Sequence, residues 1–277
     1  MSGRDELRSV ESHFKFGENW RSFADTLSER SIEEAERGLT RLFPNGELQG
    51  HRFLDVGWGS GLHMLAAQRL GAAEIVGIDL DSVSVSTTQA LLSTYASGRT
   101  WSVDVRSVFD LDPHKDGVYD VVYSWGVLHH TGDMWSAIRK VAEMVAPGGY
   151  LALALYRHTP LCGFWRVEKE IYATAPRFVQ ATMRALFKAV YLCGLIATGR
   201  NPADYIRNYV SARGMDWSHD IHDWLGGYPY ESVLPPQLIA FLQDLGFSIA
   251  RVFEHPAALM GILGSHCDEF VARRQLS

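Results

Sequence analysis

Three glycines spaced two apart follow a short apolar segment and are the clearest sign of ligand chemistry in the chain. Gly57, Gly59 and Gly61 stand between residues 53–56 and a helix-like run. Glycines at a strand-to-helix turn permit a tight bend and leave no side chain between the helix N–H groups and a ligand. Asp79 ends the next apolar segment, and a carboxylate there can accept hydrogen bonds from both hydroxyls of a ribose. The spacing G-x-G-x-G is not the dinucleotide pattern G-x-G-x-x-G, so turn and acid together predict a ligand that carries adenosine.

Four sequence blocks then occur in a fixed order, at residues 54–61, 77–81, 120–130 and 146–151. In this order they resemble the class I S-adenosylmethionine-dependent methyltransferases. The resemblance implies an α/β fold: a Rossmann-like, doubly wound, mostly parallel seven-stranded sheet with an antiparallel last strand, to which we add a helical lid insertion. It also implies transfer of a methyl group from S-adenosyl-L-methionine to an acceptor by in-line displacement, with S-adenosyl-L-homocysteine as the product.

The resemblance assigns cofactor roles to residues near the ends of successive strands. Asp55 and the glycine turn are expected at the methionine end of the cofactor, Asp79 at the ribose, and Asp104 with Val105 at the adenine edge. The floor beneath the sulfonium is assigned to three residues after the fourth strand. The complete predicted set is Asp55, Gly57, Trp58, Gly59, Gly61, Asp79, Leu80, Asp104, Val105, Ser124, Trp125 and Leu128. Trp58 departs from the family, which usually carries a smaller side chain there, and predicts an unusual rim of the cofactor pocket.

Composition and charge narrow the class of protein. The chain has 277 residues, 47% of them hydrophobic, which is enough for one globular unit with a full core. Its net charge of −6 argues against a general nucleic-acid binder, because phosphate contacts need a basic face. The three cysteines, Cys162, Cys193 and Cys267, form no C-x-x-C pair, and the first residues lack the apolar core of a signal peptide. We therefore expect a cytoplasmic protein.

Strand and helix patterns alternate through the first part of the chain, as in a parallel sheet covered on both faces. A capping box at Ser31 predicts the start of the first helix. Strands are expected near 52–57, 74–79, 100–105, 118–124 and 149–156. Helices are expected near 61–71, 82–96 and 134–146, the last ended by Pro147-Gly148-Gly149, and a helix from Pro235 to Leu245 precedes strands at 247–253 and 267–272. We divide the chain into an N-terminal arm and helix (1–48), a cofactor-binding core (49–157), a helical, aromatic acceptor-binding insertion (158–234) and a closing unit (235–277).

The insertion is where substrate choice is expected to reside. Its first part, 161–197, is apolar, rich in aromatic residues and punctuated by basic ones. It is interpreted as a lid or homodimer face, as an apolar acceptor channel, or as a face that touches a membrane. The run 185–198 is too short for a transmembrane span and contains Lys188. Acceptor contacts are assigned to Trp20, Trp165, Tyr172, Trp217 and Tyr228, and an N-terminal aromatic cluster (Phe14, Phe16, Gly17, Asn19, Trp20) is a candidate cover for the cofactor.

A general base is the chemistry that a protonated oxygen or nitrogen acceptor would require. The candidates are His130, Glu170, His219 and His222. Glu168 is a further candidate, on the same expected helix as Glu170. For His130 and its neighbour His129 a hydrogen bond at a helix start is the alternative, and for the glutamates a solvated helix face. The dense stretch 214–231 could also hold a metal or form a network of hydrogen bonds; we assign no metal.

Three functions remain open from the sequence. The first is methylation of a small, apolar or amphipathic acceptor at oxygen, carbon or nitrogen. The second is methylation of RNA or protein, although the Asn/Asp-Pro-Pro-Tyr/Phe motif is absent where Tyr123-Ser124-Trp125-Gly126 stands. The third is a protein that binds the cofactor without turnover, for which Trp58 is the main support.

Overall fold

The computed structural model describes residues 29–96, 100–213, 216–255, 261–262 and 264–276. The N-terminal aromatic cluster, including Trp20, lies outside the described residues.

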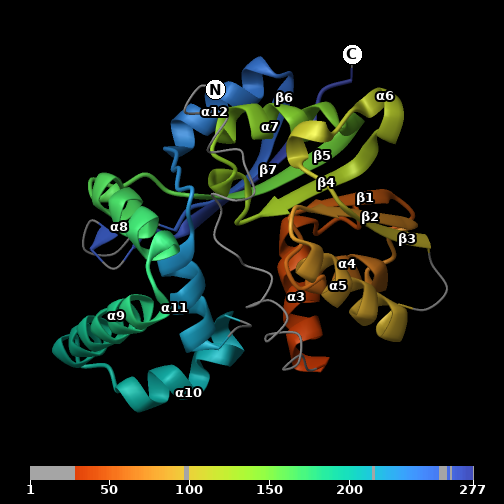
Figure 1. Cartoon of the computed structure of the whole chain (residues 1–277). Helices are drawn as coiled ribbons and strands as arrows, with labels where there is room; N and C mark the ends of the chain where they lie inside the picture. Colours follow the sequence, from red (N-terminus) through yellow and green to blue (C-terminus); the bar gives the residue numbers. More distant parts are fainter. Residues whose placement is uncertain (1–28, 97–99, 214–215, 256–260, 263, 277) are drawn as a thin grey trace.

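The core of the fold is a seven-stranded sheet of order β3-β2-β1-β4-β5-β7-β6 (Figure 1). The first five strands pair in parallel, whereas β7 runs antiparallel to both β5 and β6. This confirms the doubly wound α/β sheet and its antiparallel final strand. The strands are β1 (Arg52–Val56), β2 (Glu74–Asp79), β3 (Thr100–Val105), β4 (Tyr119–Trp125), β5 (Val145–Tyr156), β6 (Phe247–Phe253) and β7 (Cys267–Arg274).

Helices cover both faces of this sheet. On one face lie α3 (Glu29–Leu42), α4 (Leu62–Arg69) and α5 (Ser82–Tyr95); on the other lie α6 (Pro113–Asp116), α7 (Met134–Glu143) and α12 (Pro235–Asp244) (Figure 1). Two short 3-10 helices, η2 (Val108–Asp110) and η3 (Leu128–His130), follow β3 and β4. Because helices connect the parallel strands, the carboxyl ends of these strands all lie at one edge of the sheet. Ligands bind at this edge in such folds.

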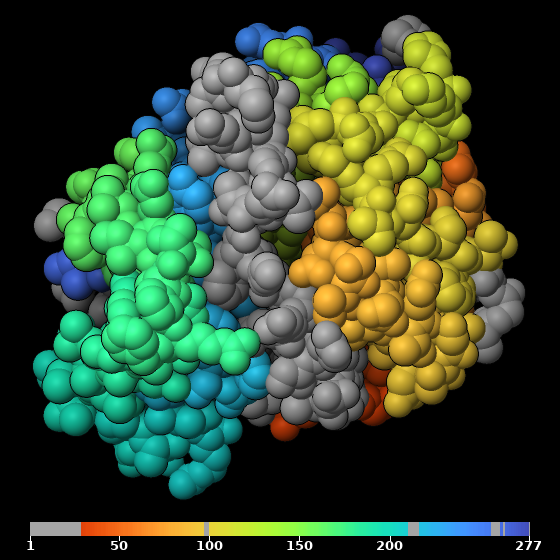
Figure 2. Space-filling model, in the orientation of Figure 1, coloured from red at the N-terminus to blue at the C-terminus, as the bar shows by residue number. Residues whose placement is uncertain are grey.

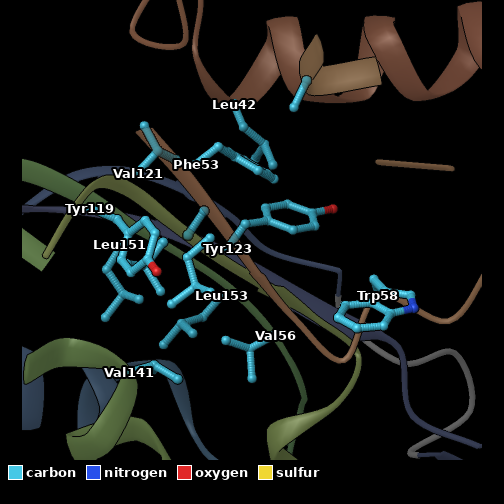
Figure 3. Packing of buried hydrophobic residues seen from close by; sticks show 14 of the residues in the cluster. Leu42, Phe53, Val56, Trp58, Tyr119, Val121, Tyr123, Val141, Leu151 and Leu153 are labelled. Carbon is cyan, nitrogen blue, oxygen red and sulfur yellow. The ribbon is translucent and has the colours of Figure 1, made fainter. Parts of the chain in front are cut away.

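Helices cover both faces of the sheet, and the strands therefore carry apolar side chains on both faces. These side chains pack against the helices and form the core. Phe53 and Tyr123 lie beside Leu42 of α3, while Val56 and Leu153 lie toward Val141 of α7 (Figure 3). The helix α3 buries Ile32, Ala35, Leu39 and Leu42, as their helical spacing predicted.

The insertion folds as four helices with a hydrophobic cluster of their own. They are α8 (Cys162–Thr174), α9 (Arg177–Ala197), α10 (Pro202–Arg213) and α11 (Trp217–Gly226). In Figure 2 the green to cyan atoms of α8 to α10 occupy one side of the visible face, and the orange to yellow atoms of α4 to α6 the other. The cluster contains Cys162, Trp165, Tyr172, Tyr209, Trp217, Ile221, Leu225 and Tyr230. The homodimer expected through this insertion stays a prediction, since the structure holds one chain.

Two predicted element boundaries are wrong. Ser31 is not a helix cap, because Glu29 and Arg30 already belong to α3 and the serine is buried within the helix. Pro147-Gly148-Gly149 does not end a helix: α7 stops at Glu143, and these residues lie inside β5. The pairing of β4 with β5 shifts register next to them, and Gly148 has a φ of 79°, so the sequence forms an irregular strand start instead.

The apolar helix α9 begins before the run 185–198, which alone is too short for a transmembrane span. It has 21 residues, and an 18-residue window has a mean hydropathy of 1.3 with 6% of that window buried. Among the described residues it is the one helix whose length and composition would suit a membrane span, and such a lone helix is weak evidence for one.

Candidate functional site

The glycine turn after β1 has backbone geometry that other residues rarely adopt. Gly57, Gly59 and Gly61 have φ angles of 78°, 59° and 79°. A Cβ atom on Gly57 would lie 2.4 Å from Cγ1 of Val127, so a side chain there would clash with the segment after β4. The Gly57 N–H donates to the Ile78 carbonyl at 2.8 Å and ties the turn to β2. The turn is therefore tight and close to both neighbouring strands, as predicted.

Two carboxylates lie next to this turn, on the ends of β1 and β2. The Asp55 side chain is 1% exposed, and its Oδ2 has no hydrogen-bond partner within the described part of the chain. Burial, followed by the negative charge of Asp79, raises the pKa of Asp55 well above its ordinary value. Burial also raises the pKa of Asp79 to about 6, although the N–H groups of Asp81 and Gly59 lower it. Two neighbouring acids, one buried and one partly buried, repel each other and favour a cationic ligand between or beside them.

Trp58 does not form an unusual rim, because its ring is buried. It is 5% exposed and packs on Gly77 of β2, where a Cβ atom would lie 2.3 Å from the indole. Its indole N–H is buried and has no acceptor among the residues that the structure describes. In Figure 3 the ring lies at the end of β1, beyond the other labelled core residues. Trp58 therefore packs beneath the glycine turn and stabilises it against β2.

The predicted adenine-edge residues lie at the open end of β3. Asp104 is exposed and Val105 is half-exposed, while Leu80 is partly buried after β2. The Arg106 N–H donates to the Asp79 carbonyl at 2.8 Å, which holds the ends of β2 and β3 together. Asp104 and Val105 are thus adjacent to Asp79 and accessible, which an adenine edge would require.

The three residues predicted beneath the sulfonium differ in their surroundings. Ser124 is buried and donates to the Val56 carbonyl at 2.9 Å, so its hydroxyl links β4 to β1. Leu128 is fully buried in η3. Trp125 is 43% exposed. Of the three, Trp125 is the side chain that a ligand at this edge could touch.

Glu269 of β7 also reaches this edge and was not predicted. It accepts the indole N–H of Trp125 at 3.1 Å and forms an ion pair with Arg41 of α3 at 2.6 Å. The available signal was a pair of acids, Asp268 and Glu269, directly before the apolar residues Phe270 to Ala272 of the final strand. Glu269 fixes the orientation of the Trp125 ring.

His129 and His130 occupy different environments in η3. His129 is fully buried, and burial together with the charges of His130 and Lys169 lowers its pKa well below the ordinary value. The Nδ1 of His130 lies 2.7 Å from the Pro229 carbonyl oxygen, which can only accept a hydrogen bond, so Nδ1 carries the proton and donates. That bond makes Nε2 the basic atom of a neutral His130. Of the two, His130 therefore has the geometry of a base.

The other base candidates are not brought to the strand edge. Glu170 is exposed on α8, in agreement with a solvated helix face. His219 lies 3.3 Å from Asp216, the N-cap of α11. His222 contacts the Tyr172 hydroxyl at 2.6 Å, and burial, then the charge of Arg184, lowers its pKa to about 4. A histidine with that pKa is a weak base at neutral pH.

Three of the predicted acceptor aromatics, Trp165, Tyr172 and Trp217, lie in the interior of the insertion. Trp165 donates to the Gly261 carbonyl at 2.7 Å, and Tyr172 is fully buried. Trp217 is also buried, whereas Tyr228 is partly exposed. Ring contacts connect this cluster to the strand edge: Trp224 lies 5.2 Å from Tyr156, whose ring lies 3.9 Å from His129.

A buried lysine at the centre of that cluster was missed from the sequence. Lys169 is fully buried, donates to the Trp224 carbonyl and lies 3.7 Å from the Trp224 ring centroid. The signal was its place between Trp165 and Tyr172 on one apolar helix face. Across the described ranges, no three His, Cys, Asp or Glu side chains gather closely enough to hold a metal ion.

A family model described as a methyltransferase domain matches residues 27–214, which is more than half of the chain. The chain belongs to this methyltransferase family. Its sequence is 39% identical over 114 residues to a ubiquinone biosynthesis O-methyltransferase of Xanthomonas euvesicatoria, covering 41% of this chain and 46% of that protein. It is 30% identical over 157 residues to the 27-O-demethylrifamycin SV methyltransferase of Amycolatopsis mediterranei, covering 52% and 54%. The methyltransferase chain thus spans about half the length of the curated relatives it matches.

The fold of the methyltransferase extends beyond that shared half. The crystal structure of magnesium protoporphyrin IX methyltransferase from Synechocystis PCC 6803 with bound SAH has a TM-score of 0.56 and 16% identity, and the match covers 98% of this chain and 97% of that one. At this identity the likeness shows the fold alone. It agrees with the Rossmann-like sheet and includes the region of the helical insertion.

Proposed function

We propose that the chain transfers a methyl group from S-adenosyl-L-methionine to a small, apolar or amphipathic acceptor in the cytoplasm. The observation that carries the proposal is a pair of acids, the buried Asp55 and the partly buried Asp79, beside a positive-φ glycine turn. The cofactor carries positive charge at its ammonium and sulfonium groups, and it supplies an electrophilic methyl group when bound. The unpartnered Oδ2 of Asp55, within the residues described, fits such a cation.

The residues of this chain would each hold a part of the cofactor. Asp55 and the turn N–H groups would bind the methionine end, and Asp79 would accept the ribose hydroxyls. Asp104 and Val105 would border the adenine. Gly126 has a φ of 78°, and in the part of the structure that is described a Cβ atom there would meet nothing within 4 Å, so the backbone after β4 leaves room at the edge.

His130 is the residue we propose as base for an acceptor that begins protonated. It follows β4 at the same edge, and its bond to Pro229 leaves Nε2 as the proton acceptor. The acceptor's apolar part would lie against the insertion, where Tyr228 is partly exposed. A curated relative named as a ubiquinone biosynthesis O-methyltransferase supports an oxygen atom as the site of transfer.

Two alternatives make different predictions. An RNA or protein acceptor would need a basic groove, whereas the chain carries a net charge of −6. A protein without turnover would bind the cofactor and transfer nothing.

The decisive experiment combines binding and transfer. The purified chain is first titrated with S-adenosylmethionine in a calorimeter, and then incubated with the methyl-labelled compound and cell extract. We expect binding, and label in the organic-soluble fraction. Label in RNA or protein would overturn the small-molecule acceptor, and absence of binding would overturn the cofactor assignment.

A further inference from the structure

An apolar pocket of about 210 Å³ lies between helices of the insertion. Its walls come from α8, α9, α11 and the loop before β7. The lining residues are Glu168, Met183, Leu186, Phe187, Val190, Leu225 and Ile262. Six of these seven side chains are apolar, and the seventh is a carboxylate.

The Glu168 carboxylate is the unusual group in this pocket. Both of its oxygens are buried, and neither has a hydrogen-bond partner in the ranges that the structure describes. Burial raises the pKa of Glu168 to about 7, and the charge of Lys169 lowers it only in part. A buried acid without a donor costs stability, so groups of this kind usually have a binding role or a partner.

The neighbouring cations do not satisfy this acid. Lys169 is directed into the aromatic cluster, where its ammonium donates to the Trp224 carbonyl and lies over the Trp224 ring. Arg184 of α9 donates to the Tyr172 hydroxyl at 2.6 Å and lies 3.3 Å from His222. Among the described residues no donor reaches Glu168, and the pocket is the open side from which a ligand can supply one.

The mouth of the pocket is apolar as well. Leu186 is 67% exposed, and Val190 and Ile262 are about half-exposed. Phe164 and Ile171, both exposed, flank Glu168 at helical spacings of four and three residues on α8. An alkyl chain entering with its head at Glu168 would cover these side chains.

The pocket is separate from the edge where the cofactor is proposed to bind. From Lys169, a layer of packed rings runs through the partly buried Trp224 and Tyr156 to the buried His129. These packed side chains stand between the pocket and the end of β4.

We propose that this pocket is a second ligand site, which binds an amphiphilic amine with its protonated amino group at Glu168 and its alkyl chain along α9. The charge of the acid selects the amine over an alcohol or an acid of the same length. The site is independent of methyl transfer, so its failure would leave the proposed function untouched.

The test uses octylamine as the probe, with octanol and octanoate as matched compounds. Binding to the full chain is measured by calorimetry and by saturation-transfer NMR, at concentrations below aggregation of the probe. We expect octylamine to bind and Glu168→Gln to weaken it by about ten- to hundredfold, the range of a charge-assisted hydrogen bond. Octanol affinity should change by less than about twofold.

Three variants make the result specific. Glu170→Gln removes a charge from the exposed side of the same helix and should leave octylamine affinity unchanged. Val190→Trp fills the pocket from a half-exposed position and should weaken amine and alcohol alike. Glu168→Gln removes a buried acid without a donor, so its melting temperature should be no lower than that of the wild type.

Other outcomes would overturn the proposal. These are no octylamine binding, equal binding to wild type and Glu168→Gln, or equal losses in Glu168→Gln and Glu170→Gln. Light scattering provides a further check: an oligomer of the wild type that Val190→Trp dissociates would assign the pocket to contact between two copies of the chain instead.

Discussion

Replacing Asp79 by asparagine should abolish tight cofactor binding and at the same time stabilise the free protein. The carboxylate is expected to accept two ribose hydroxyls, each a charge-assisted bond of roughly 1.5–3 kcal/mol. Asparagine keeps one oxygen and loses the charge, so we expect a loss of about 2–4 kcal/mol, or about thirtyfold to several-hundredfold in Kd.

The gain in stability follows from the pKa of Asp79. Its value rises from 3.8 to about 6 in the folded chain, so the folded state holds its proton more tightly than the unfolded state. As pH rises from about 4 to 6, the unfolded state ionises first and stability is lost; above 6 the loss is complete. About two pKa units correspond to about 3 kcal/mol, which partial exposure of the residue reduces to about 2 kcal/mol. The variant should therefore be more stable than the wild type at pH 7.5, and this advantage should vanish below pH 4.

The same pKa predicts the pH dependence of binding. About nine-tenths of Asp79 is ionised at pH 7 and about one-tenth at pH 5, so the apparent Kd of the wild type should rise about tenfold between them. Calorimetry measures both affinities, and urea unfolding measures stability. Asp81→Asn is the matched control, because asparagine caps a helix as well as aspartate does and Asp81 caps α5. Unchanged affinity in Asp79→Asn, or a free variant less stable than the wild type at pH 7.5, would refute the reasoning.

Two further substitutions test the structure around the site. Gly57→Ala and Gly126→Ala each place a side chain at a φ of 78°, which should lower the free energy of unfolding by about 1–2 kcal/mol in both variants. Only the side chain at position 57 clashes with a neighbour, so Gly57→Ala should lose about 1–3 kcal/mol more. Urea unfolding measures both losses, and equal losses would contradict the predicted clash. Tyr172→Phe removes a hydroxyl that contacts Arg184 of α9 and His222 of α11, and should lower the free energy of unfolding by about 1–3 kcal/mol. Tyr95→Phe, at an exposed ring, is the control and should change it almost not at all. Equal melting temperatures for the two variants would show that the Tyr172 network does not stabilise the insertion.

The sequence predicted the sheet well where each strand is bounded by strong local signals. The strands at 74–79 and 100–105 match their predicted limits. The first is an apolar run that ends at Asp79, and the second alternates polar and apolar residues. Pro147-Gly148-Gly149 misled the prediction because such residues mark an irregularity without telling whether it ends a helix or begins a strand.

Some residues of the site can be predicted from short sequence motifs, whereas others are recognised only from their contacts in the folded structure. Asp55 and Asp79 stand in short motifs, so their positions beside the glycine turn could be read from the sequence. Glu269 and Lys169 acquire their roles only through partners distant in the chain, Trp125 for the first and the Trp224 ring for the second. Burial of Trp58 was also hidden, since it depends on the missing side chain of Gly77.

The contact between Trp58 and Gly77 makes the residue allowed at each of these two positions depend on the residue at the other. The ring of Trp58 fills the space that a Cβ atom on Gly77 would occupy, at 2.3 Å. Any relative with alanine or a larger residue at the position of Gly77 should therefore carry a smaller residue at the position of Trp58. The two positions are expected to covary, and sequences that keep the tryptophan should keep the glycine.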